Sequence, residues 1–73
     1  MILALMSATT YKIIVRGTLS EHFAANFDGM RAEPAGSGTA LVGDIIDQSQ
    51  LYGLLNRLRD LGVELVGVER VAP

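Results

Sequence analysis

Hydrophobic residues recur along the chain at two spacings, which predict strands in some segments and helices in others. In segment 11–16, apolar residues alternate and β-branched residues dominate, so this segment is predicted to be a strand. Segments 30–33, 39–46 and 63–71 have a similar pattern and are predicted to be three further strands. Proline cannot donate to a strand ladder, so Pro34 predicts that the strand before it is short and lies at a sheet edge.

The clearest predicted element is a helix that begins after Asp47. Asp47 is a good N-cap, and Gln50 stands three residues later, as a capping box requires. An apolar stripe then repeats with helical spacing at Leu51, Leu54, Leu55, Leu58 and Leu61. Gly62 can end the helix in a left-handed conformation. Gly53 weakens the helix by up to about 1 kcal/mol relative to alanine, and we expect it to allow a close approach to the sheet.

A shorter helix is predicted within segment 18–27, where Thr18 or Ser20 can cap its first turn. Leu19, Phe23 and Phe27 form one narrow apolar stripe. Such a helix is too short to be stable alone, so we expect it to form because its phenylalanines dock on the core.

The predicted order of elements is strand, short helix, strand, strand, long helix, strand. Two glycines in segment 35–38 favour a hairpin turn between the middle strands. Right-handed crossovers then predict an α+β, ferredoxin-like βαββαβ fold with a four-stranded antiparallel sheet. We expect a single domain over residues 10–72, preceded by an apolar leader at residues 1–9 that is flexible or adds a strand.

Composition narrows the possible functions of this small chain. A 73-residue chain forms one domain with a marginal core. It contains no cysteine and a single histidine, so disulfides and a closed zinc site are not available to stabilise it. Hydrophobic residues make up 49% of the chain and charged residues only 19%, which favours burial against a partner chain.

Charge and hydropathy also exclude some partners. The net charge is −2 and the six basic residues are scattered, so nucleic acid is not an expected partner. The apolar start at residues 1–6 is too short for a secretory signal or a membrane span, and we expect a cytoplasmic protein.

The sheet face away from the helices is predicted to be unusually apolar. Strand alternation predicts that it carries Ile14, Val42, Val66 and Val68. Soluble monomers seldom expose such a patch, so we expect a homo-oligomer or a contact with another protein there. The alternative is that these valines are ordinary strand residues and that the apolar leader covers them.

The first strand-to-helix turn is a candidate ligand site. It comprises Gly17, Thr18, Leu19 and Ser20. Exposed amides at the start of a helix can hold an anion such as a carboxylate. The alternative is that the two hydroxyls of the turn already satisfy these amides.

Other candidate groups have ordinary structural explanations. His22 is the only side chain with an unperturbed pKa near neutrality, but the helical stripe predicts that it faces solvent. Asp44 and Asp47 bracket the start of the long helix, where Asp47 is expected to act as the cap. We therefore expect no catalytic residues, no metal and no cofactor.

Segments 15–20, 23–24, 27–30 and 47–62 resemble a family of short uncharacterised bacterial proteins, a resemblance that implies no particular function. More distantly, the leucine-rich helix, Gly-Val turn and valine strand are similar to amino-acid-sensing ACT domains. That resemblance implies an effector near the turn at residues 17–20, at a dimer interface, although the short first helix departs from the ACT pattern.

These observations lead to one functional expectation and two alternatives. We expect a non-enzymatic, homo-oligomeric interaction module that uses its open sheet face. One alternative is a domain that senses carboxylates or amino acids. The other is a cofactor-independent enzyme that resembles small dimeric isomerases and monooxygenases, with His22 or Tyr52 as the acid or base.

Overall fold

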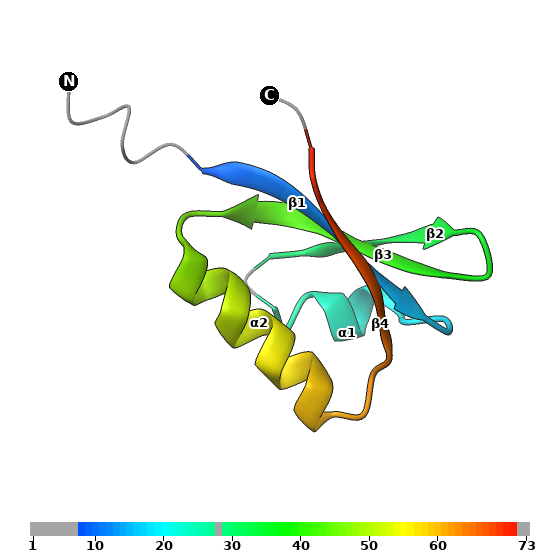
Figure 1. The fold of residues 1–73 in the computed structure, drawn as a ribbon. Coiled ribbons are helices and arrows are strands. Elements are labelled where there is room, and N and C mark those ends of the chain that lie inside the picture. The colour runs from blue at the N-terminus through cyan, green and yellow to red at the C-terminus, as the bar shows by residue number, and fades with distance from the viewer. Residues whose placement is uncertain (1–7, 28, 72–73) are drawn as a thin grey trace, which may run out of the picture.

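A four-stranded antiparallel sheet and two helices form the fold, and the computed structural model describes residues 8–27 and 29–71. The elements in chain order are β1 (Thr9–Arg16), α1 (Glu21–Ala24), β2 (Arg31–Ala35), β3 (Gly38–Ile45), α2 (Gln48–Asp60) and β4 (Leu65–Arg70). Both helices lie on the same side of the sheet (Figure 1). The strand order is β2-β3-β1-β4. The predicted ferredoxin-like βαββαβ arrangement is therefore confirmed.

The predicted leader falls outside the described residues, except for its last two positions. Of these, Thr9 already belongs to β1 and pairs with Ile45 of β3. No helix within residues 8–27 and 29–71 is both long and apolar enough to cross a membrane.

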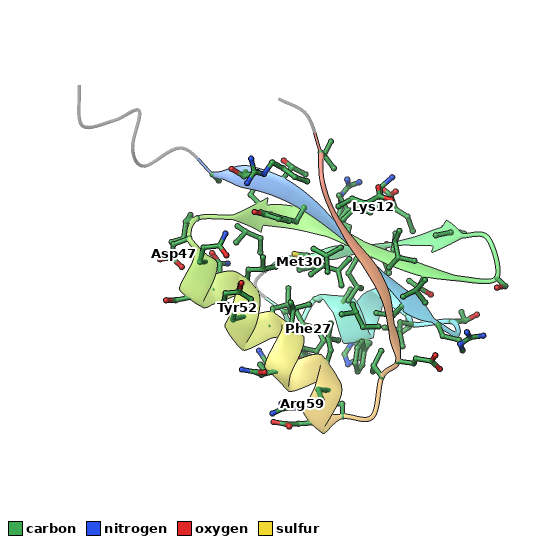
Figure 2. The ribbon with its side chains drawn as sticks, in the orientation of Figure 1. Lys12, Phe27, Met30, Asp47, Tyr52 and Arg59 are labelled. Carbon is green, nitrogen blue, oxygen red and sulfur yellow. The ribbon has the colours of Figure 1, made fainter. Side chains whose placement is uncertain are left out.

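The centre of the sheet forms the floor of the core. Ile13 of β1 lies opposite Leu41 of β3, and both side chains are fully buried. Gly43, opposite Tyr11, leaves room for the side chain of Met30, and a Cβ at Gly43 would overlap the Met30 sulfur. Figure 2 shows Met30 on the helix side of the sheet. Gly43 therefore allows a close approach, with a side chain as the neighbour.

Local hydrogen bonds begin α2 where the sequence predicts. The Asp47 carboxylate accepts from the Gln50 amide at 2.8 Å. The Gln50 side-chain oxygen accepts from the Ile46 amide, also at 2.8 Å, rather than from the cap residue itself. The capping box therefore reaches one residue further back than the usual arrangement.

The end of α2 is a Schellman motif around Gly62, whose φ is 80°. The Gly62 amide donates to Arg59 O at 2.9 Å, and the Val63 amide donates to Leu58 O at 3.0 Å. Leu61 is the C-cap and is exposed, so the predicted buried stripe ends at Leu58.

The expectation for Gly53 is wrong. Gly53 lies on the exposed side of α2, and a Cβ placed there would meet no atom within 4 Å. The glycine therefore allows no close approach to the sheet.

Helix α1 is shorter than predicted, and its phenylalanines dock on the core as expected. Ser20 is the cap, and its hydroxyl accepts from the Phe23 amide at 3.0 Å. Phe27 lies beyond the helix in a turn, is buried, and has its ring centre 5.1 Å from that of Phe23. The Arg57 guanidinium of α2 lies 4.6 Å from the centre of the Phe27 ring. Phe27 therefore links the α1 segment to α2 through this cation–π contact (Figure 2).

A bulge in β4 changes which side chains share a face. Val68 pairs with Ile13, and Gly67 pairs with Ile14, but Val15 pairs with Leu65. Val68 therefore lies on the helix side of the sheet, and alternation gives Val66 the same side. The prediction that Val66 and Val68 share the open face with Ile14 is wrong, because the bulge interrupts the alternation that would place them opposite Leu65.

Candidate interaction surface

Within residues 8–27 and 29–71, strand β4 lies at an edge of the sheet and pairs only with β1. The Val71 amide donates to Thr10 O at 2.8 Å. Bonded and non-bonded pairs alternate in an antiparallel ladder, so the main-chain groups of Glu69 and Gly67 also point toward β1. Those of Val68 and Arg70 consequently point outward, away from the sheet. Edge β4 therefore presents main-chain donors and acceptors that the rest of the sheet does not pair.

The apolar side chains of β4 are exposed as well. The exposed fractions are 47% for Leu65, 59% for Val66 and 38% for Val68. The buried core combines residues of β1, β3 and α2 with the α1 segment and Met30, and it includes none of the six β4 residues. Helix α2 thus covers the centre of the sheet and leaves β4 uncovered.

An apolar depression of about 320 Å³ lies between the end of α2 and the start of β4. It is lined by Leu55, Asn56, Leu58, Arg59, Val63 and Leu65. The exposed Leu61 lies in the same connection between α2 and β4. The apolar surface of β4 therefore continues onto the connection that precedes it. We call β4, its free edge and this depression the β4 surface.

The open sheet face is less apolar than predicted. Val42 is only 7% exposed, because Lys12 and Arg31 flank it on the two neighbouring strands. The alkyl stems of such residues can cover an apolar neighbour while their charges stay in water. Figure 2 shows Lys12 on the side of the sheet away from the helices. Ile14 is half-buried between Ala40 and Gly67.

Thr39 holds the candidate ligand turn at residues 17–20, and the sequence analysis did not identify it. The Thr39 hydroxyl donates to Gly17 O at 2.7 Å and accepts from the Leu19 amide at 3.0 Å. The Ser20 hydroxyl accepts from the Phe23 amide, so this turn satisfies part of its own hydrogen-bonding capacity. The only sequence signal for Thr39 is a hydroxyl in a predicted strand, about twenty positions from the turn, and no local pattern links the two.

A depression of about 550 Å³ adjoins this turn and includes Thr18 and Leu19 in its lining. Its charged lining residues are Glu21 and Glu33, both acidic. Two carboxylates disfavour a bound anion because like charges repel, although Arg31, 3.3 Å from Glu33 and outside this lining, offsets part of their charge. Carboxylate binding at Gly17, Thr18, Leu19 and Ser20 remains a prediction that this lining does not favour.

The other polar candidates lie apart from one another. His22 on α1 and Tyr52 on α2 are both exposed. Asp47 caps α2, and Asp44 accepts from the Thr10 hydroxyl at 2.6 Å. Within the described residues, no three His, Cys, Asp or Glu side chains gather in a group that could hold a metal ion.

Comparison with known proteins identifies a family but not an activity. No curated protein and no solved structure is significantly similar to the chain. A family model described as a domain of unknown function, DUF8691, matches residues 10–69, which include every helix and nearly every strand residue described above. The chain therefore belongs to the DUF8691 family.

Proposed function

We propose that this domain is a homo-oligomeric interaction module that associates with itself through the β4 surface. The observation that carries the proposal is an edge strand that combines outward main-chain hydrogen-bonding groups with exposed Leu65, Val66 and Val68. Soluble proteins usually protect such edges, because an unprotected edge pairs readily with another strand.

The size of the domain supports the same proposal. A chain of 73 residues buries a small core, and this one has no disulfide to reinforce it. Association would bury apolar area that the isolated domain leaves in water, and each buried valine or leucine side chain contributes about 1.5–3 kcal/mol when fully covered. A second copy is the simplest partner, since a twofold axis lets one surface serve both chains.

The open sheet face is a weaker candidate for this role. Val42 is already covered, and Ile14 is half-buried. The sensing and enzymatic alternatives find less support. The turn at residues 17–20 adjoins an acidic depression, and His22 and Tyr52 stand exposed on separate helices.

The test is the oligomeric state of Val66→Lys and of a matched control, Tyr52→Lys. Both positions are 59% exposed, but Tyr52 lies on α2. Native mass spectrometry, supported by sedimentation at micromolar concentrations, should show dimers for the wild type and the control and monomers for Val66→Lys. Circular dichroism would confirm that each variant is folded. A monomeric wild type, or a dimer that a folded Val66→Lys variant leaves intact, would refute the proposal.

A further inference from the structure

We propose that a depression at the start of α2 binds a small monocarboxylate, whose charged end contacts Arg70 and the Tyr11 hydroxyl. The depression has a volume of about 330 Å³, and its lining includes Thr9, Tyr11, Asp47 and Arg70. It lies at the end of the sheet where β1 begins and where β3 and β4 end (Figure 1). The depression of the β4 surface, at Leu65, lies at the opposite end of β4, so this site can be tested separately from association.

Tyr11 is the buried polar residue of this depression. It belongs to the hydrophobic core and is only 8% exposed. Within residues 8–27 and 29–71, no residue bonds to its hydroxyl, and no side-chain polar atom is both fully buried and unpartnered. The hydroxyl therefore reaches the surface where Tyr11 lines the depression. Buried tyrosines usually find a partner for this group, and a ligand in the depression could accept its hydrogen bond.

Arg70 supplies the positive charge of the site. It lies opposite Tyr11 in the antiparallel pair, so both side chains are on the helix side of the sheet. Its acidic neighbour Glu69 is on the other side by alternation, and Arg70 forms no ion pair with any described residue. A guanidinium presents paired donors that match the two oxygens of a carboxylate. Arg70 and Tyr11 can therefore donate to the same carboxylate.

The rest of the lining favours a ligand with a single negative charge and an apolar tail. The Asp47 carboxylate also borders the depression, but it already accepts from the Gln50 amide at 2.8 Å, and the dipole of α2 offsets part of its charge. One arginine near one carboxylate favours a monoanion over a doubly charged ion such as phosphate. Ile46, which is 63% exposed, borders the same depression and offers apolar surface to a short alkyl chain.

The test is a titration of the full chain with sodium butyrate, which replaces sodium chloride at constant ionic strength and is followed by amide chemical shifts. We expect saturable shifts at Tyr11, Gln48 and Arg70, with a millimolar dissociation constant, as is ordinary for a ligand of so few atoms. Inorganic phosphate and n-butylammonium chloride are the comparison ligands. Each should bind at least about tenfold more weakly than butyrate, because the first carries too much negative charge and the second has the wrong sign.

Two substitutions locate the site. Arg70→Gln should weaken butyrate binding by at least about tenfold, and Tyr11→Phe, which removes only the hydroxyl, by about three- to tenfold. The matched controls, Arg59→Gln and Tyr52→Phe, change exposed residues of α2 outside this lining and should leave the affinity unchanged.

The same spectra show whether each variant is folded. The absence of saturable shifts in the wild type, or an affinity that folded Arg70→Gln and Tyr11→Phe variants both retain, would overturn the proposal. Tighter binding of phosphate or of n-butylammonium than of butyrate would overturn the assignment to monocarboxylates.

Discussion

The two edges of the sheet, β2 and β4, differ in proline content and in the apolar side chains that they expose. Strand β2 has five residues, contains Pro34, and carries Arg31 and Glu33 with their charged groups 3.3 Å apart. Proline removes a donor from the edge, and charges oppose the approach of another strand. Strand β4 instead exposes Leu65, Val66 and Val68 and contains no proline.

Strand β2 therefore has one protection against pairing, a proline, that β4 lacks. Both edges belong to the same sheet, so the contrast does not follow from the fold alone. Since strands β1 and β3 carry the buried side chains, β4 could have had polar residues without loss of the core. Under the proposed function, these apolar side chains serve association rather than the core of a single chain.

The largest expected effect is on the free energy of unfolding. It compares the same change, leucine to alanine, at the centre of the sheet and next to β4. Leu41→Ala should lower the free energy of unfolding by about 2–5 kcal/mol, because Leu41 is fully buried in β3. Leu61→Ala, in the connection before β4, should change it by less than about 0.5 kcal/mol, since Leu61 is exposed. Urea denaturation at one protein concentration would measure both. A comparable loss at Leu61 would mean that this leucine is covered in the assembled protein.

Local signals predicted the parts of the fold that are encoded within a few residues. Asp47, Gln50 and Gly62 act within one turn of the helix, so the start and end of α2 followed directly from the sequence. The sequence predicted only part of the difference between the two sheet edges. Pro34 predicted a protected β2, whereas nothing near β4 showed that α2 would leave it uncovered.

Two features of the candidate surfaces depend on residues far apart in the chain. The bulge at Val66 exists because β4 must pair with β1, about fifty positions away, and it determines which face receives Val68. Thr39 holds the turn at Gly17 and Leu19 through hydrogen bonds that span about twenty positions. Alternation along one strand contains neither kind of information, which is why the predicted open face was incorrect for β4.

A second contrast compares two glycines, one in the crowded part of the sheet and one in β4. A Cβ at Gly38 would overlap the Val15 carbonyl oxygen, which is main chain and cannot rotate away. Gly38→Ala should therefore destabilise the protein by about 1–3 kcal/mol. Gly67→Ala, with open space around it, should stay within about 0.5 kcal/mol of the wild type. Thermal unfolding would compare them, and equal losses would contradict the open surroundings of β4.

Removing the protection of β2 is expected to change association more than stability. Pro34→Val restores a main-chain donor and adds a β-branched residue to the edge, and the free energy of unfolding should change by no more than about 1 kcal/mol. The variant should form species larger than a dimer, because both edges of each copy could then pair. Light scattering over a concentration series would detect them. A strictly dimeric Pro34→Val variant would show that Arg31 and Glu33 are sufficient to protect the edge.

The smallest expected effect on stability concerns two of the exposed ion pairs, Arg31–Glu33 in β2 and Arg16–Glu64 next to β4. Glu33→Gln at β2 and Glu64→Gln before β4 should each change the free energy of unfolding of the monomer by less than about 0.5 kcal/mol, since such pairs are solvated. Urea denaturation at one protein concentration would measure both variants. A loss of more than about 1 kcal/mol for Glu64→Gln alone would mean that assembly shields its pair with Arg16 from water.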